Sequence, residues 1–268
     1  MQGTFDITCQ RREHGETYIA RQYVSSPWHL SKPYWDGQIL LVQAANATAG
    51  IFSGDHLSLR VDVREHAAVL LTSPSASRIH TMHKGEATLR QSISVSANAW
   101  LEWMPELFIP QNKSSYRQIT QVDVEKGGML YMVETLAPGR VAHGESFKFE
   151  RVEWTTRINH AGRMVLSERY PLSPGNGSLI DLTYKGKSRY FANALIIYPG
   201  ADNLREWQDR LAEIAGPQDI MGLTEIDEDV YLIRLISEQS QDVKDCLRKL
   251  RDMLAEKIPQ LRQSARKL

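Results

Sequence analysis

The chain has 268 residues, of which 42% are apolar and 24% are charged, so it can bury a sizeable core as one large globular domain or one body with an appendage. Lysine plus arginine equals aspartate plus glutamate at 32 each, which excludes a global field that would attract nucleic acid or anionic lipid. Any partner must therefore be recognised through local patches.

The amino-terminal stretch has no apolar segment after a basic start, and nowhere do 18 uninterrupted apolar residues occur. We expect a cytoplasmic protein that does not enter a membrane. The two cysteines, Cys9 and Cys246, lie near opposite ends of the chain without Cys-x-x-Cys spacing. This usage favours two free thiols in a reducing compartment over a disulfide or a thiolate metal site.

The first motif in chain order is NATAGIFSGDHL, residues 46–57. Gly50 and Gly54 give the backbone freedom for a tight turn that places Asp55 at its end. Such an aspartate either caps the turn or projects its carboxylate into a site, and the motif leaves both interpretations open.

Four segments then repeat one pattern, in which a β-branched residue and a turn are followed by a small residue and an alternating apolar run. The β-branched anchors are Val63, Val95, Val124 and Ile158, at spacings of 32, 29 and 34 residues. The small residues are Ala67, Ala99, Gly128 and Gly162. Repeats of this length are typical of stacked strand-turn-strand units that bury their faces only against neighbours. Spacing alone does not decide between a solenoid and a sandwich.

One face of each repeated strand changes character at its end. Because side chains alternate along a strand, the second, fourth and sixth positions after the small residue share a face. The sixth positions are Ser73, Pro105, Glu134 and Glu168. Neighbouring third and fourth units therefore predict two glutamates close together at one end of the core.

Two interpretations of this acidic pair remain open. Either each strand simply emerges into solvent or an arginine, Arg140 or Arg169, pairs with an acid. Alternatively, the pair is semi-buried and binds or conducts a cation that relieves the repulsion between its charges. Carboxylates alone hold a borderline metal loosely, which suits transit better than storage.

Residues 73–85, SPSASRIHTMHKG, contain His80 and His83. Their spacing would allow a shared metal ion in a helix, whereas the surrounding Ser, Pro and Gly favour a loop. Ser77 in the same stretch either lines a passage or satisfies backbone groups.

Residues 101–112, LEWMPELFIPQN, predict a stretch of core residues with a bend at its prolines. Binding of a partner protein is the alternative use of these apolar side chains. The chain has no phosphate-binding loop, dinucleotide fingerprint or nucleophile elbow. A hydrolase or isomerase that uses the paired acids therefore has no supporting motif, and we expect no enzyme.

The pattern changes towards the carboxyl end. Residues 171–189 are rich in Pro, Gly and Ser and predict a loop. A β-α-β-β-α segment should follow, with elements predicted as a strand at 190–198, a helix capped by Asn203, a hairpin of 220–226 with 230–236, and a helix from Ser240 closed by Pro259. The basic tail from residue 260 should be frayed. We expect a β body at 1–189 and this segment at 190–268 to pack as one structural domain.

As an ordered set, the segments AGIFSGD, LLTSPSASRIH, LEWMPE, MLYMVETLAPGRVAHGESF and MVLSERYPL resemble the UreD family of urease accessory proteins, called UreH in some lineages. The resemblance implies a mainly β fold, a stacked β-helical or sandwich-like body of many short strands with two helices near the carboxyl end. It also implies a non-enzymatic protein that binds apo-urease and, with UreF and the GTPase UreG, passes transiently bound nickel through an internal polar tunnel. A pure interaction scaffold that holds apo-urease open without conducting metal is the alternative.

The resemblance places tunnel residues at Asp55, Ser77, Glu134 and Glu168. The repeat indicates two of these acids independently. Metal contact at His80 and His83 is a further prediction. Predicted partner contacts are Trp103, Leu107, Phe108, Ile109, Arg140 and Glu145. Departures from the family pattern, such as Ala137-Pro138 before Gly139-Arg140, leave the partner contacts open but spare the acids.

Overall fold

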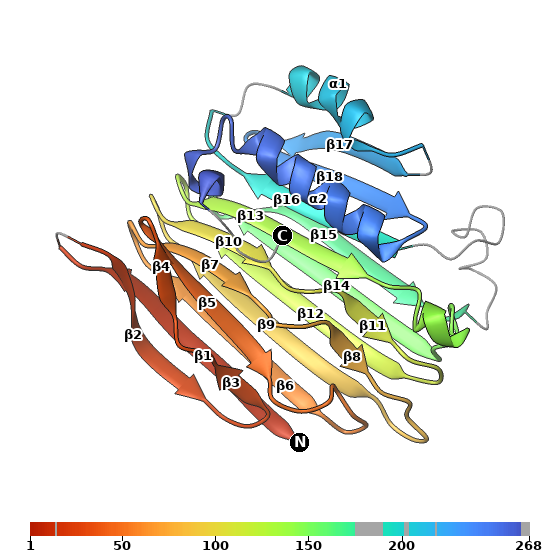
Figure 1. Ribbon diagram of the computed structural model, residues 1–268. Coiled ribbons are helices and arrows are strands. Elements are labelled where there is room, and N and C mark those ends of the chain that lie inside the picture. Colours follow the sequence, from red (N-terminus) through yellow and green to blue (C-terminus); the bar gives the residue numbers. More distant parts are fainter. Residues whose placement is uncertain (14, 175–189, 201–203, 218, 264–268) are drawn as a thin grey trace.

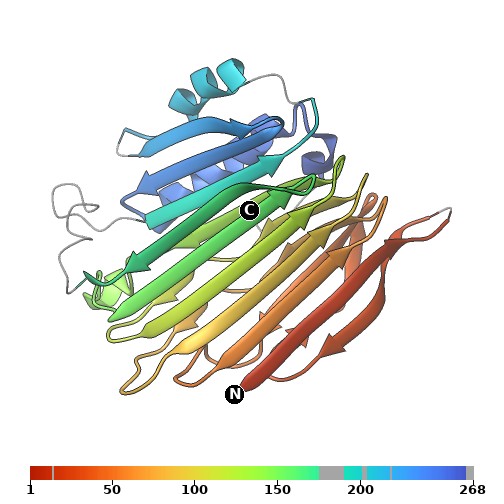
Figure 2. The same ribbon diagram turned by 180° about the vertical axis from the view of Figure 1, so that it is seen from behind.

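The computed structural model describes residues 1–13, 15–174, 190–200, 204–217 and 219–263. Within them, the strands form a seven-stranded sheet and an eleven-stranded sheet that face each other (Figures 1 and 2). The chain alternates between the two sheets, so the body is a β-solenoid. This confirms the predicted fold class and decides the question that repeat spacing left open.

The seven-stranded sheet has a parallel centre with an antiparallel strand at each edge. Its parallel strands, in spatial order, are β1 (Gln2–Arg11), β6 (His56–Val63), β9 (Ala87–Val95), β12 (Ser115–Val124) and β14 (Arg151–His160). Its antiparallel edges are β2 (Thr17–Val24) beside β1 and β15 (Arg163–Leu172) beside β14. Figure 2 shows this sheet with no helix over its outer face.

The eleven-stranded sheet forms the opposite wall. Its parallel strands are β5 (Ile39–Asn46), β7 (Ala68–Thr72), β10 (Trp100–Met104) and β13 (Met129–Leu136). Short strands complete the coils: β3 (Trp28–Leu30), β4 (Tyr34–Asp36), β8 (Ser77–Ile79) and β11 (Phe108–Pro110). A 3₁₀ turn at Val141–His143 follows β13.

The sequence repeat is the corner at which the chain passes between sheets. Val63, Val95 and Val124 lie side by side in register at the ends of β6, β9 and β12. The small residue of each corner closes a turn, as Gly128 does when its N–H donates to the carbonyl of Glu125 at 2.9 Å. A Cβ at Gly128 would lie 2.9 Å from the carbonyl oxygen of Ser96 in the coil below, so stacking requires small residues here.

The fourth repeat departs from the prediction. After Ile158 the chain turns back through Ala161 and Gly162, and β15 pairs antiparallel with β14 instead of crossing to the other sheet. A bulge in this hairpin places Met164 on the outer face with 60% exposure, although the pattern put it on the inner face. The bulge therefore displaces Met164 alone, and Leu166 and Glu168 keep the face that the pattern predicted.

The carboxyl-terminal segment widens the eleven-stranded sheet. β16 (Tyr190–Ile197) pairs with β13, and β18 (Val230–Ser237) and β17 (Ile220–Asp227) continue the sheet. Helices α1 (Leu204–Ile214) and α2 (Ser240–Leu254) lie on the outer face of this sheet (Figure 1). The predicted β-α-β-β-α order is confirmed. Hydrogen bonding runs directly from the solenoid strand β13 into this segment.

Two apolar cores result. One fills the solenoid between the sheets, and the other lies between the eleven-stranded sheet and its helices. Trp207 and Leu250 are fully buried in the second core. A buried ion pair also joins α2 to the solenoid, because Arg251 Nε donates to Glu102 Oε1 at 2.7 Å and Arg251 Nη2 to Glu102 Oε2 at 3.0 Å.

Several predicted details are corrected or fall outside the described residues. Pro171 and Leu172 belong to β15 instead of the loop expected at 171–189, and residues 175–189 and Asn203 are not described. Ser240 does not cap α2, since Gln239 occupies the cap position without a side-chain hydrogen bond. The first residues of the expected frayed tail form a 3₁₀ turn at Pro259–Arg262, in which Leu261 is buried at 1% exposure, and residues 264–268 are not described.

The two cysteines, Cys9 and Cys246, are free and buried, which confirms the predicted unpaired thiols. Burial raises the pKa of the Cys9 thiol to about 12, with a smaller contribution from the charge of Asp62. Neither described helix is long and apolar enough to span a membrane.

Candidate functional site

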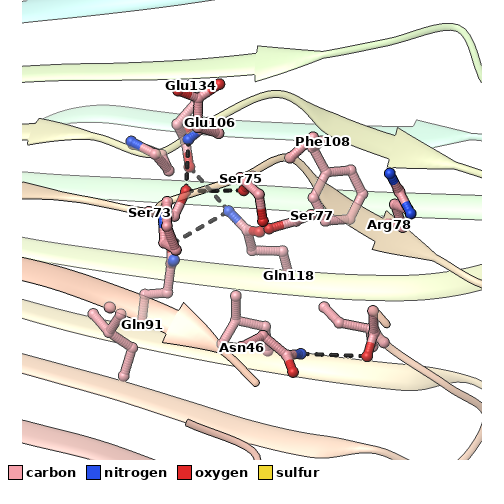
Figure 3. A pocket seen from close by; sticks show the side chains of 18 of the residues that line it. Asn46, Ser73, Ser75, Ser77, Arg78, Gln91, Glu106, Phe108, Gln118 and Glu134 are labelled. Carbon is pink, nitrogen blue, oxygen red and sulfur yellow. Dashed lines mark hydrogen bonds between the residues drawn. The ribbon is translucent and has the colours of Figure 1, made fainter. Parts of the chain in front are cut away.

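A cavity of about 230 Å³ lies inside the solenoid and is called here the internal cavity. Its polar lining includes Ser73, Ser75, Ser77, Gln91, Gln118 and Glu134 (Figure 3). The serines come from the segment after β7, the glutamines from the seven-stranded sheet and Glu134 from β13. Polar side chains from both sheets thus face the internal cavity.

Glu134 is held by hydrogen-bond donors from the opposite sheet. Its Oε1 accepts from Gln118 Nε2 at 2.9 Å and from Trp154 Nε1 at 3.0 Å. Its Oε2 accepts from Thr156 Oγ1 at 3.2 Å, and Thr120 Oγ1 lies 3.5 Å from Oε1. Among the ion pairs of the described residues, none includes Glu134. The carboxylate is oriented by neutral donors, and its charge is available to a cation.

The donors form a connected network across neighbouring strands. Thr120 Oγ1 donates to Gln91 Oε1 at 2.8 Å, and Tyr116 Oη donates to Gln118 Oε1 at 3.1 Å. Gln91, Gln118 and Thr120 are at most 7% exposed. A satisfied buried network of this kind fixes the positions of its members. It therefore fixes the position of the carboxylate of Glu134.

This network was not predicted from the sequence, although a signal for it was present. Alternation along β9 and β12 places the apolar residues Leu89, Ile93 and Val122 on the inward face. The same face also includes the polar residues Gln91, Gln118 and Thr120. Gln91 and Thr120 are direct partners in the parallel register. Polar residues at inward positions of adjoining strands indicate a lined cavity rather than a closed core.

Burial governs the acidity of Glu134. The carboxyl group is surrounded by protein, and burial raises its pKa to about 7, while hydrogen bonds from Trp154 and Thr156 lower it. The charge of Glu168 adds a smaller increase. Glu134 is nevertheless only half-buried by accessible surface, because it borders open cavity space. A deep but accessible carboxylate fits a hydrated interior.

Glu134 also joins two cavities. A second space of about 190 Å³, the end cavity, lies between β14 and β15 on one side and β13, β16 and β18 on the other. Its lining includes Leu136, Tyr170, Phe191 and Arg234. Glu134 and Trp154 line both the internal cavity and the end cavity. This side-chain pair therefore stands where the two spaces meet.

Glu168 lies near Glu134, as the repeat predicted, but a hairpin instead of a further stacked unit brings it there. The β14–β15 hairpin places Glu168 opposite Thr156, on the inner face of the seven-stranded sheet. Its carboxylate accepts from Tyr170 Oη at 2.7 Å and pairs with Arg234. Tyr170 and Arg234 line the end cavity, so Glu168 supports its wall. Glu168 is thus paired with an arginine, as one interpretation allowed, but the partner is Arg234 rather than Arg140 or Arg169.

Of the other two predicted tunnel residues, Ser77 and Asp55, only Ser77 lines the internal cavity. Ser77 lines the internal cavity from β8. Asp55 does not line the described cavities; it is 2% exposed, lies 2.5 Å from the amino group of Met1 and accepts from the Phe52 N–H at 2.8 Å. The structure therefore supports the turn-capping interpretation of Asp55.

His80 and His83 lie in a loop, as the flanking residues indicated. His80 stacks on Phe52 with ring centroids 4.4 Å apart, and its Nε2 lies 3.1 Å from the Ala49 carbonyl oxygen. The described residues contain no group of three or more His, Cys, Asp or Glu side chains able to hold a metal ion. The prediction of a histidine metal site gains no support.

The predicted partner contacts are mostly internal. Trp103 and Phe108 are buried at 3% and 4% exposure inside the solenoid, and Leu107 and Ile109 pack against the second core. The core interpretation holds for Trp103 and Phe108, whereas Leu107 and Ile109 are only partly buried, so partner contact there stays a prediction.

Arg140 and Glu145 shape the loop after β13. Arg140 Nε donates to Glu145 Oε2 at 2.8 Å, and that carboxylate also accepts from the Asn112 N–H at 3.1 Å. The hydrogen bond from Arg140 lowers the pKa of Glu145. A Cβ at Gly139, where φ is +140°, would lie 2.1 Å from the Glu145 carbonyl oxygen, so glycine is required beside this pair.

Because the pKa of Glu134 is raised in the folded protein, the free energy of unfolding should depend on pH. Between pH 4.5 and about 7 the folded protein retains a proton that the unfolded chain has lost, so stability falls as pH rises through this interval. Glu134→Gln removes this titration, and the variant should gain up to about 3 kcal/mol relative to wild type between pH 4 and pH 8. Urea denaturation at both pH values measures the difference. Identical pH dependence in the two proteins would contradict the burial of this acid.

The sequence of this chain is similar to a family of known proteins along almost its whole length. A protein-family model described as "UreD urease accessory protein" matches residues 1–267. A protein named urease accessory protein UreD from Opitutus terrae is 37% identical, covering 99% of this chain and 98% of its own length. Its counterpart from Acetivibrio thermocellus is 25% identical over 90% of this chain and 92% of its own length. A protein named urease accessory protein UreH from Helicobacter hepaticus is 25% identical over 75% and 79%.

Proposed function

This chain belongs to the UreD family of urease accessory proteins, and we propose that it passes nickel through its interior during maturation of the urease metal centre. The observation that carries the proposal is the position of Glu134. It is an unpaired acid at the junction of two cavities, and its carboxylate faces neutral donors.

The chemistry of the internal cavity supports transit rather than storage. A divalent cation that passes the hydroxyls of Ser73 and Ser77 meets the carboxylate of Glu134 among amide and hydroxyl groups. Oxygen ligands without thiolate or imidazole hold nickel weakly, so the ion is released again. Binding also favours the ionised form of Glu134, and any proton on its carboxyl group leaves as the ion arrives.

Glu168 and Asp55 take different parts in the proposal. Glu168 neutralises Arg234 beside the end cavity, which keeps an uncompensated cation from repelling nickel there. Asp55 is already occupied by the amino group of Met1 and a backbone N–H, so we leave it out of the route.

The proposal includes the partners that the family resemblance implies. The chain would bind UreF and apo-urease, with UreG supplying nickel after GTP hydrolysis, and it would hold no permanent cofactor and perform no catalysis. It would act in the cytoplasm, where its free buried thiols persist without oxidation. Neutral composition gives no reason to invoke nucleic acid or membrane as a partner.

A charge-free isostere tests the proposal. Glu134→Gln should lower urease activation in cells by about tenfold, because the cation-attracting charge is lost while the size of the side chain is kept. Assembly with UreF, UreG and apo-urease should remain intact, as judged by copurification. Glu134→Ala with Glu168→Ala should be at least as impaired. Normal activation by an intact Glu134→Gln complex would favour the pure scaffold instead.

A further inference from the structure

A third cavity, of about 130 Å³, lies between the start of α2 and the outer face of the eleven-stranded sheet. We call it the helix cavity. Its floor includes Leu70 and Val133 from the sheet and Leu247 from α2, and its rim includes Glu106 and Lys244. The helix cavity is thus on the opposite side of the sheet from the internal cavity.

The sheet between these two spaces is interrupted. β10 pairs with β13 over four residues, from the pair Trp100 and Met129 to the pair Trp103 and Met132. Along the same edge of β13, the next paired residue is Leu136, which pairs with Phe108 of β11. The inward position after Trp103 is Pro105, which has no backbone N–H and cannot continue the ladder. The backbone ladder of the solenoid wall is therefore broken at the residues between.

Four residues frame this break, which we call the lateral window: Thr72, Pro105, Glu106 and Thr135. Each of them lines both the internal cavity and the helix cavity. Alternation makes the side chains of Thr72 and Thr135 point away from the solenoid interior, towards the helix cavity. All four residues lie between the two cavities, so one layer of residues separates the cavities where the backbone ladder is broken.

Glu106 gives the lateral window an acidic group. Its backbone N–H donates to Ser73 Oγ at 2.8 Å, which anchors the segment after Pro105. Its Oε2 lies 3.9 Å from Lys244 Nζ on α2, a long contact with a lysine that is 56% exposed. A long ion pair with one solvated partner is weak, so Lys244 can leave the carboxylate of Glu106. Glu106 and Glu134 line the same internal cavity (Figure 3).

We propose that the lateral window is a second mouth of the internal cavity, at which Glu106 receives a divalent cation and Lys244 competes for the same carboxylate. This inference rests on the proposed function and adds a branch to the route. The cation passes from the helix cavity through the lateral window to Glu134. Because Lys244 belongs to α2, any shift of the first turns of this helix alters access to Glu106.

The test uses whole cells that express urease with all its accessory proteins under limiting nickel, and measures nickel per purified urease. Glu106→Gln should lower nickel incorporation about fivefold, whereas Lys244→Ala should leave it equal or higher because the competing ammonium is gone. Glu225→Gln is the matched control, since it removes an exposed carboxylate from β17 of the same sheet. It should behave as wild type.

Glu134→Gln is measured in parallel to separate the two claims. If Glu134→Gln is impaired and Glu106→Gln is normal, the second mouth is refuted while the proposed function stands. If Glu106→Gln and Lys244→Ala fall together, their ion pair is structural and the inference also fails. Normal nickel incorporation in Glu134→Gln overturns the proposed function and the branch with it.

Discussion

Replacing Arg251 with methionine is expected to lower the free energy of unfolding by about 3–5 kcal/mol, the cost of leaving a buried charge without its partner. Glu102 is 0% exposed and Arg251 is 5% exposed, so neither charge can be rehydrated without moving α2. Arg251 Nη2 also donates to the Gln263 carbonyl at 3.0 Å. One side chain therefore joins the solenoid, α2 and the segment after it.

Arg248→Met provides the control. Arg248 is on the same helix, is 49% exposed and pairs with Asp245 at 2.9 Å, so its loss should cost less than about 1 kcal/mol. A double variant, Glu102→Leu with Arg251→Met, removes both buried charges and should recover much of the lost stability. Urea denaturation measures all three. Equal effects of Arg251→Met and Arg248→Met would refute the role of the buried pair.

Ser77→Trp is expected to reduce urease activation to the level seen without this protein. Ser77 lines the internal cavity, whose volume is about 230 Å³, and an indole ring directed into it would obstruct passage while all the acids remain. The effect should exceed that of Glu134→Gln, because a physical block stops the ion whatever its charge. Nickel per urease and urease activity are the measurements.

Ser77→Ala separates obstruction from loss of the hydroxyl group and should keep most of the activity. Copurification with apo-urease shows whether Ser77→Trp still assembles, and circular dichroism shows whether it folds. An assembled, folded Ser77→Trp complex with normal activation would mean that nickel does not pass through the internal cavity.

Much of the fold follows from local sequence. The anchors Val63, Val95 and Val124 predicted stacked units, because a corner that repeats in every coil leaves the same residue types at the same spacing. The last unit could not be distinguished in this way. Its anchor, turn and alternation resemble the others, yet β15 folds back onto β14, since the choice between crossing and returning depends on tertiary pairing.

Local sequence also predicted one part of the site, the position of Glu134, but not the residues that hold it. Alternation along β13 identified Glu134 as an acid at the end of an apolar face, and the structure places it in the interior. The partners that orient it come from β12 and β14 of the opposite sheet, a contact that no spacing within one strand encodes. Asp55 shows the converse. Its turn was predicted correctly, but only the fold revealed that its carboxylate is already satisfied.

The most direct test of nickel passage is transfer in a purified system. The complex of this protein with UreF, UreG and apo-urease is given one pulse of radioactive nickel and GTP, and label in urease is followed over time. We predict that Glu134→Gln slows arrival of the label about tenfold while the amount of complex stays unchanged. Arrival at the wild-type rate in that variant would contradict a route through the interior.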